Sequence, residues 1–530
     1  MLSPSNTEVQ GDFRAAPRGR TATTRRSAAR PGRSCAHFPH TSGLTGAARI
    51  GTLWRLRHGT RIRSGLPVVF GQGGLRMGER RAISRRRHGL AVLLLTVLAG
   101  CAGTDTAPSG SPSGFNWRQF QGTTLRVLLT NTPWQGAIVK YIPEFTELTG
   151  IQVSVGVLSQ DELWKTLEAD LRAPGRVDVF SVIPNLDGLH YVNAGQIQPV
   201  NDYLRNPRLT PAQYAWDDFF PKFREAMQVR GSILGPPVMA ENMALLYRKD
   251  VFSKHQVTLP RTLDELEATA RYLHRKAMTF QGGPGVGIVS RGQGPMATGL
   301  YASLLHSFGG TWLDGQGRPT LNGPQSLEAL RWINRVFGQF APPDMSRFGW
   351  QEASALFLEG RSAMYIEGSS IYPLIEDSTS RIAERVGYAP FPSGPAGFGA
   401  TVAVRGLAIA KQSASPEAAW LFMEWASGPE MVRKALMHGV LVARESTWKD
   451  RQARSEVPPD LAESLQQSGR TGRVDWLPPL VAVTSAREVV GGVITAALQG
   501  GNIREAADRA NRDLEEVISK TERPSATPPR

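Results

Sequence analysis

Short apolar runs alternate with amphipathic segments along most of this chain. Apolar runs at 125–129, 153–157 and 177–182 predict three buried strands. Between these runs, apolar side chains recur at three- and four-residue spacing after Trp134 and after Ser159, which predicts two helices. A strand–helix–strand–helix–strand order with short connections implies parallel strands. The pattern therefore predicts a doubly wound α/β layer.

The second half of the chain continues this pattern. Apolar runs at 244–247 and 406–410 predict further strands. Thr262 and the glutamate three residues later fit a capping box, in which the side chain of each accepts a hydrogen bond from the backbone N of the other. This motif predicts that a helix starts at Thr262. Residues from Ser485 onward predict a helical C-terminal region with a break at Gly500-Gly501.

Two clusters of glycine and proline interrupt the alternation, at 231–237 and at 390–395. Such clusters favour a change of chain direction rather than the continuation of a helix or strand. We expect the chain to cross there between two lobes.

The positive charge of the chain is confined to its first 100 residues. The formal net charge is +15, and residues 1–100 contain 18 arginines and 3 acidic residues. The remaining 430 residues contain 43 basic and 43 acidic side chains, so they are neutral overall. A basic nucleic-acid-binding surface is therefore excluded for the folded part, and we expect no nucleic-acid partner.

A secretion signal accounts for part of this charge. Arginines at 80–87 precede an apolar run at 90–98, which is too short to span a membrane. The run ends in Leu-Ala-Gly-Cys at 98–101 and resembles the lipobox of bacterial lipoproteins, which implies cleavage before Cys101 and attachment of a lipid to its sulfur. A plain signal peptide is the alternative. Arg80-Arg81 resembles a twin-arginine signal, so both export routes stay open.

The segments on either side of the signal have simple compositions. Residues 1–76 are rich in arginine, and we interpret them as a disordered extension that is not translated if synthesis starts at Met77. Residues 77–100 form the predicted signal peptide, and 101–120 contain the lipidated cysteine and a tether rich in Ser, Pro and Gly. A lipid anchor followed by a tether indicates a domain held at a membrane of the cell envelope, on its periplasmic or extracellular face.

Known catalytic motifs are missing from the chain. It contains no P-loop, no His-Glu-x-x-His and no Gly-x-Ser-x-Gly sequence, and its histidines are dispersed. The two cysteines, Cys35 and Cys101, allow no disulfide framework beyond the leader. We therefore expect no metal and no cofactor. Glu241 and Glu367 are the only acids considered for a glycosidase pair, and the sequence does not fix the distance between them.

Several segments of the chain resemble the family 1 extracellular solute-binding proteins, the maltose-type receptors of ABC sugar importers. They include FTELTGIQV at 145–153, AGQIQPVNDY at 194–203 and AMYIEG at 363–368. Further matching segments are 177–180, 244–252, 259–266, 308–310 with 313–314, 406–411 and 415–419. Each segment is weak alone, but their number, order and spacing extend from about residue 124 to 520.

The resemblance implies two α/β lobes of the periplasmic-binding-protein type II, each with a doubly wound sheet and flanking helices. A ligand cleft lies between the lobes and closes on the solute. We expect a monomer that delivers its solute to the permease subunits of the transporter. The implied division has an N-terminal lobe, a C-terminal lobe and a disordered tail: 121–235 with 396–442, 236–395 with 443–520, and 521–530.

The resemblance and the chemistry of a sugar together indicate candidate ligand-binding residues. Apolar sugar faces stack on aromatic rings, while hydroxyls need fixed donors and acceptors. Glu241 matches a sugar-binding glutamate of the maltose-type receptors. Trp134 follows the first strand and is either a ligand contact or a core aromatic. The other candidates are Asn185, Asp187, Asn242, Trp312, Glu367, Ser369 and Arg405.

Two of these positions depart from the family pattern. Many relatives have a tryptophan where this chain has Ser369, so a stacking platform is missing and a maltodextrin ligand is disfavoured. Arg405 stands where relatives often have glycine, and it indicates either an acidic or phosphorylated solute or a surface side chain.

These features together predict a lipid-anchored receptor of an ABC importer that binds a carbohydrate or related polyol without turnover. Two alternatives remain open. One is a secreted lipoprotein that hydrolyses glycans, and the other is a sensory receptor that acts with a membrane kinase.

Overall fold

The computed structural model describes residues 114–522 apart from 277–278 and 281–282. The chain divides into two units, 1–104 and 105–530, and all the described residues belong to the second. The predicted signal peptide, Cys101 and most of the predicted tail lie outside the described residues. Among the described residues, no helix combines the length and the apolar character needed to cross a membrane.

Nine strands form one sheet, in which seven follow the order β10-β11-β7-β13-β3-β1-β2 while β12 pairs with β7 and β4 with β13. Their bounds are β1 Thr124–Thr130, β2 Gln152–Leu158, β3 Val179–Val182, β4 Ile197–Gln198, β7 Pro237–Arg248, β10 Val286–Val289, β11 Ser362–Gly368, β12 Val386–Pro390 and β13 Val402–Ala410. Two small hairpins are separate from this sheet: β5 Gln228–Val229 with β6 Ser232–Ile233, and β8 Thr279–Phe280 with β9 Gly283–Pro284.

The predicted parallel layer is confirmed. β1 pairs in parallel with β2, with Leu125 opposite Val153, and on its other side with β3, with Val127 opposite Val179. The helices between these strands are α1 (Pro133–Ile138), α2 (Ile142–Thr149) and α3 (Gln160–Asp170). The α3 helix begins with a capping box of Ser159 and Glu162.

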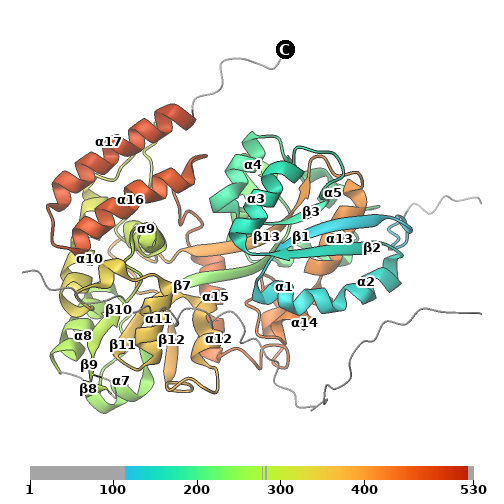
Figure 1. The fold of residues 1–530 in the computed structure, drawn as a ribbon. Helices are drawn as coiled ribbons and strands as arrows, with labels where there is room; N and C mark the ends of the chain where they lie inside the picture. Colours follow the sequence, from blue (N-terminus) through green and yellow to red (C-terminus); the bar gives the residue numbers. More distant parts are fainter. Residues whose placement is uncertain (1–113, 277–278, 281–282, 523–530) are drawn as a thin grey trace, which may run out of the picture. The chain divides into compact units, whose positions relative to one another are not determined.

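Two long strands join the two groups of helices in Figure 1. The first half of β7 pairs with β13, where Ala240 lies opposite Val404, and its second half pairs with β11 and β12. The end of β13 pairs with β3 and β4. The predicted crossings at the two glycine and proline clusters therefore lead into β7 and β13. At Gly235 a Cβ atom would lie 2.1 Å from the carbonyl oxygen of Leu407, so the crossing needs a glycine there.

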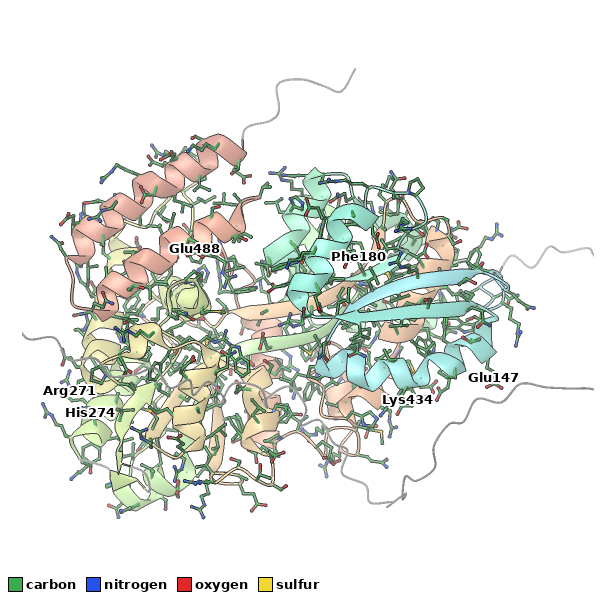
Figure 2. The ribbon with its side chains drawn as sticks, viewed as in Figure 1. Glu147, Phe180, Arg271, His274, Lys434 and Glu488 are labelled. Carbon is green, nitrogen blue, oxygen red and sulfur yellow. The ribbon has the colours of Figure 1, made fainter. Side chains whose placement is uncertain are left out.

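Two clusters of buried apolar residues form the core. The first surrounds β1, β2 and β3 and includes Phe180, which is labelled in Figure 2 and meets Tyr191 edge to face at 5.4 Å between ring centroids. It also contains α13 (Pro416–Ser427), α14 (Pro429–Leu436) and Leu461 and Leu465 of α15 (Pro459–Thr471). On its surface Lys434, also labelled in Figure 2, pairs with Glu144 of α2 at 2.6 Å.

The second cluster lies on the side of β10 and β11. It is formed by α8 (Leu263–Arg275), α9 (Thr298–Ser307), α10 (Pro324–Phe340), α16 (Val483–Leu498) and α17 (Ile503–Thr521). The last two helices fit the prediction of a helical region interrupted at Gly500-Gly501. The remaining helices are α4 Leu189–Asn193, α5 Asn201–Arg205, α6 Pro221–Ala226, α7 Lys249–His255, α11 Trp350–Leu358 and α12 Tyr372–Ile375.

The α15 helix packs against β12, against β7 and against α6, so it contacts strands and helices from both groups. The division of the chain into an N-terminal and a C-terminal lobe stays a prediction.

Candidate functional site

Three polar side chains follow the carboxyl ends of the three parallel strands. Trp134 follows β1, Gln160 follows β2, and Asn185 lies in the π-helical turn Pro184–Gly188 after β3. The indole Nε1 of Trp134, Nε2 of Gln160 and Oδ1 of Asn185 are buried and have no hydrogen-bond partner among the described residues. Buried polar atoms are normally paired. Because the carboxyl ends of parallel strands meet at one edge, these atoms mark that edge as a candidate for binding a polar solute.

Asp187 lies in the same turn and is already hydrogen-bonded. Its Oδ1 accepts from the backbone N of Ile183 at 2.9 Å, and its Oδ2 accepts from Nε1 of Trp164 at 3.1 Å. The residue is only 6% exposed, and burial raises the pKa of its carboxyl to about 7. The Arg405 guanidinium acts in the opposite direction and favours the carboxylate.

Arg405 of β13 and Glu241 of β7 come together where these two paired strands pass between the two halves of the sheet. Nη2 of Arg405 lies 3.9 Å from Oε1 of Glu241, and the hydroxyl of Ser370 donates to Oε2 of the same carboxylate. The side chains of Arg405 and Glu241 are 32% and 18% exposed, so both are accessible to a small molecule. Two of the predicted site residues are therefore neighbours, and the structure adds Ser370 to them.

A second charged pair lies next to Glu241. Glu367 is 1% exposed. Its carboxylate accepts hydrogen bonds from Nε of Arg291 at 2.7 Å and from the hydroxyl of Tyr365 at 2.8 Å. It also accepts from Nη2 of Arg291 and from the backbone N of Gly368. A Cβ atom at Gly368 would lie 2.8 Å from Oε2 of Glu241 and 3.9 Å from Nη2 of Arg291. Glu241 and Arg291 therefore flank Gly368. Both oxygens of Glu367 are occupied by donors within the protein.

Three other predicted residues lie in different surroundings. Asn242 is fully buried, and its Nδ2 donates to the hydroxyls of Ser464 and Ser468 of α15, each at 3.0 Å. Its backbone N donates to the hydroxyl of the buried Ser369 at 3.1 Å. Trp312 is 2% exposed, and its Nε1 donates to the backbone oxygen of residue 475 at 2.7 Å. These contacts tie strands, helices and loops together.

Trp134 is likewise 2% exposed, so its ring belongs to the core, and only its unpaired Nε1 is notable. The sequence left open whether Trp134 is a ligand contact or a core aromatic.

Three groups next to the site were not predicted. Trp164 of α3 donates to Asp187, Arg291 pairs with Glu367, and Trp476 has a buried Nε1 with no partner among the described residues. A Cβ atom at Gly299 would lie 3.3 Å from the methyl carbon of Met243 and 4.0 Å from the ring of Trp476, which places Trp476 beside β7. A signal existed for Arg291, which follows a strand by two residues. Trp164 falls in a helical pattern, where an aromatic residue is normally interpreted as core.

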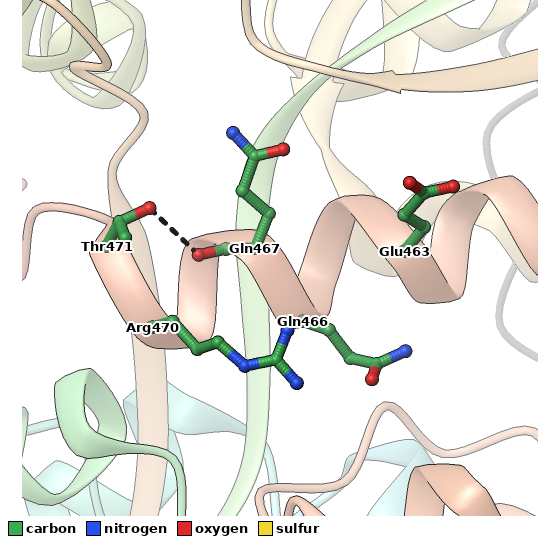
Figure 3. Close-up of a pocket in the computed structure, with 5 residues that line it drawn as sticks. All are labelled: Glu463, Gln466, Gln467, Arg470 and Thr471. Carbon is green, nitrogen blue, oxygen red and sulfur yellow. Dashed lines mark hydrogen bonds between the residues drawn. The ribbon is translucent and has the colours of Figure 1, made fainter.

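A surface pocket of about 250 Å³ lies along α15 (Figure 3) and contains none of the predicted residues. It is lined by Glu463, Gln466, Gln467, Arg470 and Thr471. Thr471 donates from its hydroxyl to the backbone oxygen of Gln467 at 3.0 Å, so the lining is part of the helix surface. Among the described residues, no group of three or more His, Cys, Asp or Glu side chains is placed to hold a metal ion.

Comparison with known proteins supplies relatives over most of the chain. The chain is 28% identical over 402 residues to an erythritol/L-threitol-binding protein of Mycolicibacterium smegmatis, which covers 68% of this chain and 81% of that protein. It is 27% identical over 307 residues to a mannitol-binding protein of Pseudomonas aeruginosa, and this match covers 57% of this chain and 65% of that protein.

Solved structures show the same fold. A solute-binding protein of an ABC transporter from Agrobacterium radiobacter K84, in complex with ribitol, matches with a TM-score of 0.63 and 23% identity over 75% of this chain and 99% of that chain. A protein of the same description from Agrobacterium vitis S4, with bound D-mannitol, matches with a TM-score of 0.59 and 22% identity over 75% and 99%. Both are two-lobed solute-binding proteins, so the predicted fold class is confirmed.

The family model described as "Bacterial extracellular solute-binding protein" matches residues 131–433. This segment contains β2 to β13 together with Glu241, Arg291, Glu367 and Arg405. The chain belongs to the family of bacterial extracellular solute-binding proteins.

Proposed function

We propose that this protein is the receptor of an ABC importer and binds a small neutral polyol or sugar between the strand edge at Asn185 and the charged groups at the crossing of β7 and β13. Relatives named for erythritol or threitol and for mannitol, and fold neighbours that hold ribitol and mannitol, support this class of solute. The permease subunits of the importer are the partners that such a receptor requires.

The observation that carries the proposal is the arrangement of Glu241, Ser370 and Arg405. A carboxylate accepts hydrogen bonds, and a guanidinium only donates them. Two adjacent hydroxyls of a polyol can therefore donate to Glu241 and accept from Arg405 at the same time. The positive charge of Arg405 is balanced by Glu241 at 3.9 Å, so the pair does not require a charged solute.

The same contacts argue against an acidic or phosphorylated solute. Glu241 lies beside Arg405, and Glu367 occupies the guanidinium of Arg291 with two hydrogen bonds. An anion would meet carboxylates next to each arginine, and like charges at such distances repel. A neutral molecule avoids this cost.

Attachment to the membrane through Cys101 belongs to the proposal as well. The lipobox at 98–101 supports it, and the tether would hold the receptor near its permease. Metabolic labelling with a palmitate analogue in a bacterial host, with Cys101→Ser as the matched control, measures this part separately.

The experiment for the solute is a thermal-shift and calorimetry panel on residues 105–530, with tetritols, pentitols, hexitols, disaccharides, sugar acids and sugar phosphates. A ligand at 100 times its dissociation constant stabilises a protein by about 2.7 kcal/mol. We expect polyols or monosaccharides to raise the melting temperature by several degrees and to be recovered unchanged. A response to sugar acids or phosphates alone contradicts the proposed class, and recovery of a cleaved product contradicts the receptor assignment.

A further inference from the structure

Trp164 is a partly exposed tryptophan whose ring is held in one orientation. It lies in the second turn of α3, the helix that follows the carboxyl end of β2. The start of that helix is fixed by the capping box, in which Ser159 and Glu162 bond to each other's backbone. The indole has a single donor, Nε1, and this donor is bound by Oδ2 of Asp187 at 3.1 Å. Backbone and ring are therefore both anchored.

Asp187 is a rigid anchor for this ring. Its second oxygen accepts from the backbone N of Ile183 at 2.9 Å, and the residue is 6% exposed. Both oxygens are thus engaged within the protein, which leaves the carboxyl poorly placed to receive hydroxyl groups from a solute.

Trp164 lies at the strand edge that carries the unpaired polar atoms. Its indole donates to Asp187 in the turn Pro184–Gly188, which also contains Asn185, and Gln160 stands one turn earlier on α3. The ring therefore lies on the side of the site formed by α3.

The other aromatic candidates do not offer an exposed face. Trp134 and Trp312 are each 2% exposed, and position 369 is a buried serine. A polyol or sugar has apolar C–H faces as well as hydroxyls, and solute sites supply aromatic or aliphatic walls for them. Trp164 is a side chain of that kind, and the structure leaves it partly open on the α3 side of this site.

We propose, building on the proposed function, that Trp164 forms the apolar wall against which the carbon chain of the solute packs, and that Asp187 is a positioning residue that holds the indole in place. This assignment gives Asp187 an indirect role in place of the direct contact with hydroxyls expected from the sequence. It also supplies the stacking surface that the serine at position 369 does not provide.

The test is a double-mutant cycle on residues 105–530, read out as the dissociation constant of whichever polyol or sugar the panel identifies. We expect Trp164→Ala to weaken binding about ten-fold or more, since a tenfold change corresponds to 1.4 kcal/mol. Trp164→Phe keeps a ring and should lose less. Trp216→Phe is the matched control, because that tryptophan is also partly exposed but packs on Tyr214 and Phe219 at the first core cluster.

The second half of the cycle distinguishes a positioning role of Asp187 from a direct contact with the solute. If Asp187 acts through the indole, Asp187→Ala weakens binding in the wild-type background and has no further effect in the Trp164→Ala background. Equal losses in both backgrounds overturn the positioning role and restore a direct contact. Asp187→Asn, which keeps one acceptor oxygen, should recover part of the affinity and serves where the alanine variant does not fold.

A spectroscopic readout addresses the ring itself. The protein is labelled with 5-fluorotryptophan, and the Trp164 resonance is assigned from its loss in Trp164→Phe. We expect this resonance to shift on addition of the solute, and an unchanged resonance while the solute binds overturns the proposal. A wild-type protein that binds nothing in the panel contradicts the proposed function first, so the two failures are distinguishable.

Discussion

Nη2 of Arg405 on β13 lies 3.9 Å from Oε1 of Glu241 on β7, and these are the two strands that pass between the two halves of the sheet. In the register of the two strands, Ala403 lies opposite Glu241 and Arg405 lies opposite Met239, so the charged pair is diagonal. Cross-strand diagonal neighbours are within reach of long side chains. A solute bound by this pair therefore contacts the strands about which the lobes of such receptors move.

Removal of the guanidinium should weaken solute binding with little effect on folding. Arg405 is one-third exposed and its ion partner Glu241 is 18% exposed, so Arg405→Ala removes no fully buried ion pair. Hydrogen bonds that involve a charged group contribute about 1.5–3 kcal/mol, which predicts a rise in the dissociation constant of about ten-fold or more. Arg405→Lys keeps the charge without the planar fork of donors, so its dissociation constant should lie between those of the wild type and of Arg405→Ala. Calorimetry of each variant measures the effect.

Arg318→Ala is the matched control for this substitution. Arg318 is 70% exposed and pairs with Asp314 on the surface, and we expect its loss to leave the dissociation constant unchanged. If both arginine variants bind as the wild type does, Arg405 is a surface residue, as the alternative reading of the sequence allowed.

An alanine at position 368 should act on Glu241 alone. Gly368 has φ −61°, a conformation that any residue adopts, so Gly368→Ala causes no backbone strain. Its Cβ atom would lie 2.8 Å from Oε2 of Glu241, closer than real Cβ atoms come, so the end of this flexible side chain would have to move away. We expect weaker binding with a nearly unchanged melting temperature. Gly136→Ala, where a Cβ meets nothing within 4 Å, is the control, and equal affinity of the two variants contradicts the role of Glu241.

The strands were predictable because each contains a run of mostly apolar residues, although β2 lies at the edge of the sheet and its side chains are partly exposed. The 125–129 and 153–157 runs correspond to β1 and β2 within one residue at each end. The predicted strand at 244–247 is longer in the structure, since β7 begins at Pro237. Its first half contains Glu241 and Asn242, and these polar residues ended the apolar pattern early.

The separation of Glu241 from Asn242 follows from strand geometry. Successive side chains of a strand point to opposite faces. Glu241 therefore meets Arg405 on one face, while Asn242 reaches α15 on the other. The sequence suggested both residues as ligands because it did not show that the strand extends through them. The position of Arg291 just after a strand was a signal, but the sequence showed neither its partner nor the role of Ser370, since each meets its carboxylate through a pairing distant in sequence.

Asn242 should be important for stability. Its Nδ2 donates to Ser464 and Ser468, which are fully buried on α15. Asn242→Ala leaves two buried hydroxyls without their donor, and each unsatisfied group costs about 1–3 kcal/mol. Urea denaturation should show a loss of free energy of unfolding of about 2 kcal/mol or more for the two groups together. Asn193→Ala, at an exposed asparagine, should stay within about 0.5 kcal/mol of the wild type, and similar losses for both variants contradict the prediction.

The pH dependence of stability above neutral pH should come from Glu424 of α13. This residue is 2% exposed, and neither carboxyl oxygen has a hydrogen-bond partner among the described residues. Burial raises the pKa of its carboxyl to about 9, and the opposing effect of the buried Arg444 is smaller. Arg444 is committed to other partners, since it donates to the backbone oxygens of Ser427 and Tyr214, both at 2.7 Å.

The sign of the effect follows from proton binding. Between the ordinary pKa of 4.5 and the raised value of about 9, the folded protein keeps the proton that the unfolded chain has released. Stability then falls as pH rises through this window, by up to roughly 1.4 kcal/mol per pH unit. The raised pKa of Asp187, about 7, adds a similar slope only below pH 7. The interval from pH 7 to 9 therefore separates the effect of Glu424 from that of Asp187.

Glu424→Gln replaces the neutral acid by a neutral amide of the same shape. We expect its free energy of unfolding to decline less than that of the wild type between pH 7 and 9, because the titrating group is gone. Glu417→Gln, at an exposed position of the same helix, should keep the wild-type slope. Urea denaturation at pH 7, 8 and 9 measures all three proteins. Parallel curves for the wild type and Glu424→Gln would show that water reaches the carboxyl and that its burial does not control its proton.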